Sequence, residues 1–329
     1  MSVIVAIDGG QSQCRVAVSA DGAVTATCTT AGLSYAGDPG GVRTVTGLLD
    51  FLQDYLAPQL TGRPAPTFVL ALTGMPSATE SRSQIAAAVA ARYRPVRQLI
   101  SSDLPAAFAG AVGLQAGAVI SAGSGTIALG LDGTGGAHRV GGGGAMLGDD
   151  GSAYWIGLQG LREAWRARTG RSGSADLLSR AAQRYDPVSG LPGRLLASRN
   201  PVSVIAEFAV DVVAASDAGD DAAAGILRQA ASHLADILCC AAEAATARQG
   251  RPEPRLAMSW SGRLLHSAAL HDLFAAAVRH RLPWARVLPP EGTALDGAVL
   301  LGTAPDLNMM GDQVTIADSA GAITPDARR

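Results

Sequence analysis

Two stretches of the chain share one pattern, in which a short apolar run leads into a glycine-rich turn and then into alternating apolar residues. The first covers residues 3–18 with its turn at 8–12, and the second covers residues 117–131 with its turn at 122–126. Short apolar runs are typical of buried strands, and alternation is typical of strands with one covered face. The pattern therefore predicts two β-hairpins, each closed by a glycine-rich turn.

Glycine-rich turns of this kind are suited to binding anions, because backbone N–H groups can approach an anion closely where no Cβ intervenes. Small hydroxyl side chains in the turns add further donors. The candidate phosphate-binding residues are Gly9, Gly10, Gln11, Ser12 and Gln13 in the first turn and Gly123, Ser124, Gly125 and Thr126 in the second. Two such turns, the first carrying the carboxylate of Asp8, suggest two halves of one chain gripping one polyphosphate.

The rest of the first 116 residues alternates between strand and helix patterns. After the first hairpin we expect a strand at 23–28, a helix at 40–57 broken by Pro58, a strand at 67–72, a helix at 83–92, a strand at 96–100 and a helix from 103 to 113. This order of elements predicts an α/β fold with a mixed sheet.

The second half is dominated by helical patterns after its hairpin. We expect helices at 153–169, 175–185, 201–215 and 220–248, a strand at 256–260, a helix to about 280, a strand at 285–288 and a helix at 293–302. The region 170–250 is interpreted as a helical insertion and a dimer surface. Residues 305–329 are predicted to be a flexible tail.

Composition limits the classes of protein that the chain can belong to. With 329 residues, 48% of them hydrophobic and 16% charged, it can form two compact domains rather than a disordered chain. The apolar runs are too short for a membrane span, and a strand pattern close to the first residue leaves no signal sequence, so we expect a cytoplasmic protein. A net charge of −2 gives no reason to expect nucleic acid or an anionic membrane as a partner.

The chain contains no lysine, and all 26 basic residues are arginine. A Walker-A loop and a protein-kinase fold each need a lysine at the phosphates, and Schiff-base chemistry needs one as well, so all three are excluded. The cysteines, Cys14, Cys28, Cys239 and Cys240, lack the spacing of a zinc or iron–sulfur site and are interpreted as buried thiols. Nucleotide binding must therefore rely on backbone amides, hydroxyl groups and a metal ion.

Four carboxylates stand where they could carry chemistry. Asp8 is either a turn residue or a ligand that holds Mg²⁺ against the β- and γ-phosphates of ATP. Asp103 follows a predicted strand, and it is either a helix cap or a general base that takes the proton of an attacking sugar hydroxyl. Asp149 and its neighbour Asp150 either complement the dipole of the following helix or accept hydrogen bonds from a polyol.

These motifs together resemble a known family. The stretches 7–10, 102–103 and 121–125, and above all Gly-Asp-Asp-Gly-Ser-Ala-Tyr-Trp-Ile-Gly at 148–157, resemble the N-acetylglucosamine kinase branch of the BadF/BadG/BcrA/BcrD ATPase family. That family belongs to the actin/hexokinase/Hsp70 superfamily. The resemblance covers residues 3–303, in order and at suitable spacing.

The resemblance implies two ribonuclease-H-like, actin-like ATPase domains with a central cleft. The first would span residues 1–116 together with a returning helix at 293–303, and the second would span residues 117–292 with the helical insertion. The substrates would be ATP, with Mg²⁺ as cofactor, and an amino sugar, and the protein would be a homodimer.

The resemblance also assigns site residues. Asp103 would be the catalytic base on the sugar 6-hydroxyl, and Asp8 and Asp103 would face the metal. Ser261 and Gly262 would lie at the adenosine site. The sugar would be bound by Ser34, Asp38, Asp103, Gly142, Gly143 and Asp149.

The sequence departs from the family pattern at three places that bear on the substrate. Ser34 and Tyr35 stand near the position of a usual asparagine, Gly143 replaces a common tryptophan, and Ser261 replaces the first of two glycines. Asp38 could instead pair with the ammonium group of a free amino sugar.

The expected function is therefore an ATP-dependent amino-sugar 6-kinase acting on N-acetylglucosamine, with glucosamine as the alternative. The rivals of another class are an ATPase activator of a radical dehydratase, for which the adjacent cysteines have poor geometry, and a non-catalytic sugar sensor. The related repressor and sugar-kinase family normally carries a cysteine-rich zinc motif, which is absent from this sequence.

Overall fold

The computed structural model describes residues 2–323 except 36, 39, 76–77 and 248–255. Two compact units are present. The first comprises Met1–Ala116, Leu131–Ala137 and Pro289–Arg329, and the second comprises Gly117–Gly130 and His138–Leu288. Each unit is described by itself.

The first unit is built on a six-stranded sheet with the strand order β10-β5-β4-β1-β2-β3. Its strands are β1 (Val3–Gly9), β2 (Gln13–Ala20), β3 (Ala23–Ala31), β4 (Thr67–Leu72), β5 (Arg97–Ser101) and β10 (Val314–Ala317). Strands β1, β4 and β5 run parallel, and the hairpin strands β2 and β3 run antiparallel to their neighbours. The carboxyl ends of β1, β4 and β5 therefore meet at one edge of the sheet.

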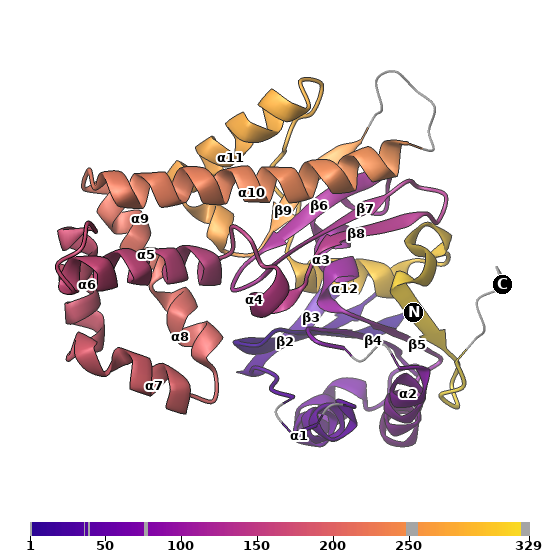
Figure 1. The fold of residues 1–329 in the computed structure, drawn as a ribbon. Helices are drawn as coiled ribbons and strands as arrows, with labels where there is room; N and C mark the ends of the chain where they lie inside the picture. Colours follow the sequence, from indigo (N-terminus) through magenta and orange to yellow (C-terminus); the bar gives the residue numbers. More distant parts are fainter. Residues whose placement is uncertain (1, 36, 39, 76–77, 248–255, 324–329) are drawn as a thin grey trace. The chain divides into compact units, whose positions relative to one another are not determined.

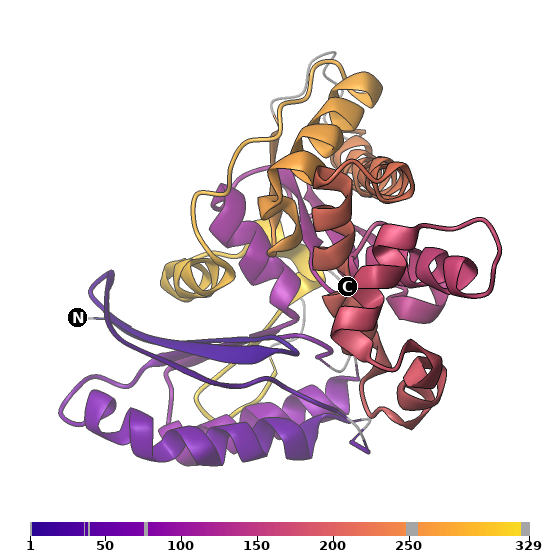
Figure 2. The same ribbon diagram turned by 90° about the vertical axis from the view of Figure 1, so that its left-hand side faces the viewer.

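Helices cover both faces of this sheet (Figures 1 and 2). The helices α1 (Val42–Leu60) and α2 (Thr79–Tyr93) lie on one face, where they form a core with Val5, Ile7 and Leu70. The helices α3 (Asp103–Val112) and α12 (Ala294–Thr303) lie on the other face. Successive strand residues point to opposite faces, so residues such as Ile4 and Val69 contact α12 instead.

Helices α3 and α12 cross with their backbones almost in contact. A Cβ on Gly297 would lie 1.9 Å from the carbonyl oxygen of Ala106, and one on Gly110 would lie 2.0 Å from that of Thr293. Glycine at both positions is therefore a steric requirement of the crossing. Thr293 also begins α12 with a capping box that includes Asp296, which fixes where the helix starts.

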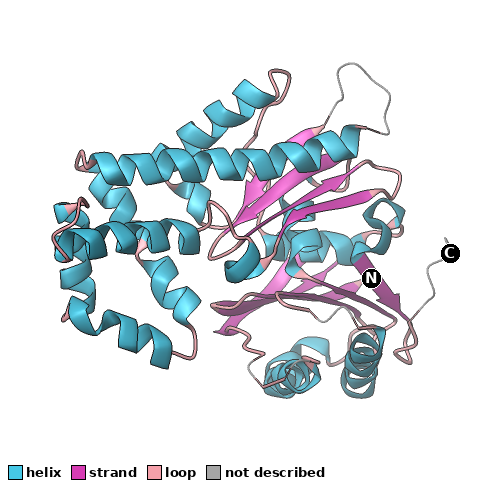
Figure 3. Cartoon of the chain, viewed as in Figure 1, coloured by secondary structure: helices cyan, strands magenta, loops and turns pink. Residues whose placement is uncertain are grey.

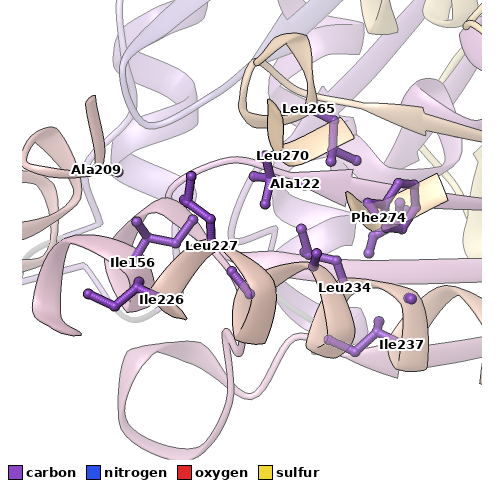
Figure 4. Close-up of a cluster of buried hydrophobic side chains, with 14 of the residues drawn as sticks. Ala122, Ile156, Ala209, Ile226, Leu227, Leu234, Ile237, Leu265, Leu270 and Phe274 are labelled. Carbon is purple, nitrogen blue, oxygen red and sulfur yellow. The ribbon is translucent and has the colours of Figure 1, made fainter. Parts of the chain in front are cut away.

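The second unit contains a four-stranded sheet with the order β8-β7-β6-β9. Its strands are β6 (Gly117–Ala122), β7 (Thr126–Leu131), β8 (Ala137–Gly141) and β9 (Ala257–Ser261). Helices α10 (Asp221–Thr246) and α11 (Ala268–Arg281) pack against each other, and α10 also packs on β6. Figure 4 shows the core between them, in which Leu227 and Leu234 lie near Leu270 and Phe274.

The remaining helices of the second unit are grouped around α5 (Figures 1 and 3). They are α4 (Gly144–Leu147), α5 (Ala153–Arg168), α6 (Ala175–Tyr185), α7 (Leu191–Ala197), α8 (Pro201–Glu207) and α9 (Ala209–Asp217). Short 3₁₀ turns complete the described elements: Val188–Gly190, Leu264–His266 and Asn308–Gln313. Within the part of the chain that the structure describes, no helix is long and apolar enough to cross a membrane.

Most elements predicted from the sequence form, including both hairpins and the helical character of 170–247, while the last residues of the expected helix and insertion, from 248, lie outside the described residues. Some boundaries are wrong. Helix α1 continues past Pro58 to Leu60, because a proline in the last turn removes one hydrogen bond without ending the helix. The helix expected at 201–215 is divided at Phe208, and the strand expected at 285–288 is reduced to one bridge at Val287.

The prediction of a flexible tail at 305–329 is wrong for its described part. Residues 314–317 form β10, which pairs antiparallel with β5 through partners such as Val314 and Ser101. Val314 and Ala317 are buried. A strand of four residues is too short for its pattern to be recognised without its partner strand. Residues 324–329 lie outside the described residues.

We expect Gly297→Ala to lower the free energy of unfolding by about 1–3 kcal/mol, because its Cβ would be forced against the α3 backbone. The matched control is Gly47→Ala in α1, where nothing lies within 4 Å of the added Cβ. That change should raise stability by about 0.5–1 kcal/mol. Urea unfolding measures both, and equal effects would contradict the proposed close crossing.

Candidate functional site

The first glycine turn connects β1 and β2 of the first unit. The N–H of Gly10 donates to the carbonyl of Gln13 at 3.0 Å, and Gln11 and Ser12 at the tip are exposed. Among the described residues, neither Gln11 nor Ser12 donates its N–H to a backbone carbonyl. Two consecutive N–H groups at an exposed turn are available to an anion.

The segment that follows β3 packs against this first glycine turn. A Cβ on Gly32 would lie 2.1 Å from the carbonyl oxygen of Gln11, so only glycine fits there. The N–H of Leu33 donates to Gly10, and the N–H of Thr73 at the end of β4 donates to Gly9. The sequence analysis assigned no role to Gly32 or Thr73, whose contacts depend on tertiary packing.

Asp8 is buried near the carboxyl end of β1, 4% exposed. The hairpin register places Arg15 directly opposite, and its guanidinium lies 2.7 Å from Oδ2 of Asp8. Burial raises the pKa of Asp8, and the positive charge of Arg15 opposes that rise in part. The charged carboxylate is thus under-compensated by the protein, which favours a cation or another donor beside it.

Asp103 is the first residue of α3, directly after β5. Ser102 occupies the N-cap position, so Asp103 does not cap the helix and instead places its carboxylate in the first turn. Strand β4 lies between β1 and β5, and all three are parallel. Asp8 and Asp103 therefore lie at the same edge of the sheet, about two strand spacings or 10 Å apart along the edge.

Tyr35 is a member of this region that the sequence analysis did not assign. Its ring approaches Gly74, where an added Cβ would lie 2.9 Å from it, and its hydroxyl is buried without a hydrogen-bond partner among the described residues. Burial raises the pKa of Tyr35 well above its usual value, and the charges of Cys14, Asp103 and Asp38 add to this effect. Tyr35 therefore presents a neutral hydroxyl to the same region as Asp103.

Asp38 and Ser34 lie on the segment between β3 and α1. Oδ2 of Asp38 accepts hydrogen bonds from the N–H and the hydroxyl of Thr44, each at 2.8 Å, and these bonds lower the pKa of Asp38. Both bonds join the carboxylate to the start of α1, and a pairing of Asp38 with a sugar ammonium stays a prediction. Ser34 is exposed and its carbonyl accepts from Thr44, so a sugar contact by its side chain stays a prediction.

The second glycine turn connects β6 and β7 of the second unit. The N–H of Gly123 donates to Gly125 at 2.9 Å, and Ser124 is exposed at the tip. Within the described ranges, no backbone carbonyl accepts from the N–H of Ser124 or Gly125. The second turn thus repeats the arrangement of the first, with two consecutive N–H groups available to an anion.

The side chain of Asp149 stabilises the second glycine turn. Its Oδ1 accepts from the N–H of Thr126 at 3.0 Å, and a Cβ on Gly125 would lie 2.8 Å from the same oxygen. Asp149 is buried, and burial raises its pKa although the bond from Thr126 lowers it. Its backbone has φ +59°, a region that favours glycine and asparagine among ordinary residues.

Helix α5 also fixes the turn. The N–H of Ala153 donates to the carbonyl of Gly123 at 2.9 Å, and the N–H of Tyr154 donates to Ser124. Ser152 is the N-cap and accepts from the N–H of Trp155. The most specific sequence motif, 148–157, is therefore the connection that ties the turn, Asp149 and the start of α5 together.

Ser261 and Gly262 lie beside this turn. Strands β6 and β9 are parallel neighbours, and Ser121 and Ser261 are partners at their carboxyl ends. Gly262 has φ +88°, and its Cβ would lie 2.3 Å from the carbonyl oxygen of Ala122. The two loops therefore form one continuous edge, which is where open α/β sheets bind ligands.

Gly142 and Gly143 follow β8. The N–H of Gly142 donates to the carbonyl of Thr126 at 2.9 Å, which joins this loop to the second turn as well. Gly142 has φ +75°, and a Cβ there would meet the side chain of Ile127 at 2.7 Å. The structure brings Gly142, Thr126 and Asp149 together, and the contact of Gly142 and Gly143 with a sugar stays a prediction.

The residues present fit a magnesium ion that arrives with a nucleotide. No group of three or more histidine, cysteine, aspartate or glutamate residues that could hold a metal occurs in the described part of the chain. Mg²⁺ with a nucleotide needs only one or two protein carboxylates, since phosphate oxygens and water complete its shell. Asp8 would supply one carboxylate, and a contact of the more distant Asp103 with the metal stays a prediction.

Comparisons with known proteins identify the family and the fold of the chain. The sequence profile of the BadF/BadG/BcrA/BcrD ATPase family matches residues 5–302. No curated protein matches the chain.

Several solved structures have the same fold. A candidate N-acetylglucosamine kinase from Chromobacterium violaceum is 23% identical with a TM-score of 0.69, covering 92% of this chain and 99% of that one. One from Porphyromonas gingivalis is 15% identical with a TM-score of 0.65, covering 92% and 98%. A ROK family glucokinase from Streptomyces griseus, in complex with glucose and AMPPNP, is 17% identical with a TM-score of 0.50, covering 92% and 98%. The predicted fold class, a two-domain actin-like ATPase fold, is confirmed.

We expect Asp8→Asn to be more stable than the wild type at pH 7 in the absence of nucleotide. Because the pKa of Asp8 is raised by folding, ionisation costs the wild type stability as the pH rises through that pKa. The loss of the half-exposed Arg15 partner should matter less. Urea unfolding of both proteins from pH 4 to 7 should show the advantage shrinking towards acid, and an advantage that grows towards acid would contradict the assignment.

We expect Asp149→Ala to lower the free energy of unfolding by about 1–3 kcal/mol, because the buried N–H of Thr126 would lose its acceptor. Asp149→Asn keeps an acceptor oxygen and tolerates the positive φ, so it should stay close to the wild type. Thermal melting of the two variants measures the difference. An equal loss in both would show that the charge, rather than the hydrogen bond, holds the turn.

Proposed function

The chain belongs to the BadF/BadG/BcrA/BcrD ATPase family, and from that premise we propose that it is an ATP-dependent kinase that phosphorylates the 6-hydroxyl of an amino sugar. The observation that carries the proposal is the pair of matching glycine turns, at 9–13 and 123–126, each with two N–H groups available to an anion. Both turns bind phosphates of ATP in this proposal.

Phosphoryl transfer from ATP to a sugar mainly requires that the reactants are aligned and that the negative charge on the phosphates is neutralised. The sugar oxygen attacks the γ-phosphorus, the bond to the β-phosphate oxygen breaks, and ADP leaves. Asp103 accepts the proton of the attacking hydroxyl, and a carboxylate in the first turn of a helix at a strand end is suited to that role. Asp8 would hold Mg²⁺ beside the phosphates, and the ion would neutralise developing negative charge.

N-acetylglucosamine is the proposed sugar, because two structures of the same fold are named as candidate kinases for it. Glucosamine is the alternative. The ammonium group of glucosamine would pair with the carboxylate of Asp38, whose Oδ2 also accepts from Thr44. Asp149 and the 142–143 loop are the proposed sugar contacts from the second unit, and the protein is proposed to work as a homodimer.

An ATPase activator of a radical dehydratase is the rival of another class. Such a protein would need accessible cysteines to bridge a cluster between subunits. Cys239 is fully buried in the core of the second unit, and burial raises the pKa of its thiol to about 11. Cys240 is partly buried and accepts from Arg281. A buried thiol with a raised pKa is a poor cluster ligand, so the kinase is the better proposal.

The test is ADP release with ATP and Mg²⁺ against a panel of N-acetylglucosamine, glucosamine, N-acetylmannosamine, N-acetylmuramic acid and glucose. We expect turnover with N-acetylglucosamine, and Asp103→Asn should lower kcat about 100-fold to 10,000-fold because the proton acceptor is lost. The control Glu80→Gln changes an exposed carboxylate in the first turn of α2 in the same unit.

Retained sugar binding in Asp103→Asn, measured by calorimetry, would separate the catalytic role from a structural one. ATP hydrolysis that no sugar stimulates would favour the activator. Sugar binding without any turnover in the wild type would favour the non-catalytic sensor.

A further inference from the structure

A pocket lies in the helical part of the second unit, among residues that the proposed kinase site does not use. It has a volume of about 430 Å³ and is open to solvent. Its walls come from α5, α7 and α8, which Figure 1 and Figure 3 show as neighbours. Pockets of this volume are in the range that holds a small molecule.

The pocket has an apolar floor. Leu161 of α5, Leu191 of α7 and Ile205 of α8 line it and are each less than a tenth exposed. Trp165 adds a partly buried indole to the wall. These side chains would cover a hydrocarbon or aromatic group of a ligand.

The rim is positively charged. Arg162, Arg166 and Arg171 line the pocket, and all three are exposed. Arg166 is paired with Glu163, whereas no carboxylate partner is recorded for Arg162 or Arg171 among the described residues. Two unpaired guanidinium groups beside an apolar floor are complementary to a phosphate or carboxylate that carries an apolar body.

The charge around the pocket is local. Residues 158–199 contain eight arginines and three acidic residues, although the whole chain has a net charge of −2. Three of these arginines line the pocket, whereas Arg180 and Arg184 are paired with Asp176 and Asp211. Such a field attracts anions to this part of the surface.

Helix α5 connects this pocket to the second glycine turn. Its first residues donate to the carbonyls of Gly123 and Ser124, and its later residues Leu161 and Arg162 line the pocket. The helix has 16 residues and spans about 24 Å. A ligand that shifts α5 would move the turn at the other end of the same helix.

We propose that this pocket is an effector site for a small amphipathic organic anion, and that its occupancy changes nucleotide binding at the second glycine turn through α5. The second half of this statement rests on the proposed function. The first half, the binding of the anion, does not.

The binding test is calorimetric titration of the full chain with octyl phosphate and with nonanoate, each below its micelle concentration. Octyltrimethylammonium is the matched cation. We expect one or both anions to bind and the cation not to bind, and the stronger anion identifies the head group that the arginines prefer. Binding should be about tenfold or more weaker in the double variant Arg162→Gln/Arg171→Gln.

The control variant is Arg228→Gln/Arg279→Gln, which removes two exposed arginines from α10 and α11 of the same unit. It should bind the anions like the wild type. Equal weakening in the two double variants, or binding of the cation, would overturn the proposed site. A changed oligomeric state in Arg162→Gln/Arg171→Gln, with no anion bound by the wild type, would assign the pocket to an interface between copies instead.

The coupling test is the dissociation constant of ATP with and without saturating octyl phosphate. We expect it to change in the wild type and not in Arg162→Gln/Arg171→Gln. ATP that binds with the same affinity under both conditions would overturn the coupling. A wild type that does not bind ATP at all would overturn the proposed function, while the anion titration would still decide the site.

Discussion

The second glycine turn depends on a buried hydrogen bond, from the N–H of Thr126 to the carboxylate of Asp149. The missing Cβ of Gly125 lets that carboxylate lie directly beneath the turn. Asp149 is also where the chain turns towards α5, whose first N–H groups bind the carbonyls of the same turn. The buried carboxylate and the first N–H groups of α5 therefore fix the turn together, and the N–H groups of Ser124 and Gly125 remain available at its tip.

Each of the two units has a buried carboxylate near a glycine turn: Asp8 in the first unit and Asp149 in the second. Burial raises the pKa of both carboxylates. In the first unit the partner is the guanidinium of Arg15, and in the second it is a backbone N–H. A carboxylate left under-compensated in this way costs stability in the free protein and gains interactions when a cation arrives, which is common at binding sites.

Much of this arrangement could be predicted from the sequence, because it is local. The hairpins and their turns follow from alternation and glycine, and the positions of Asp8 and Asp103 follow from strand ends. The contacts of Tyr35 with Gly74 and of Gly32 with Gln11 could not be predicted, since they join segments with no shared pattern. The contact between Arg15 and Asp8 is an intermediate case, because the register of the predicted hairpin is enough to place these two residues opposite each other.

The pairing of β10 with β5 has a consequence for the newly made chain. Strand β5 ends at Ser101, but the strand that covers its edge begins at Val314, more than 200 residues later. During synthesis the whole second unit emerges before that partner exists. The edge of β5 therefore stays open for most of translation, and an open edge can pair with other chains.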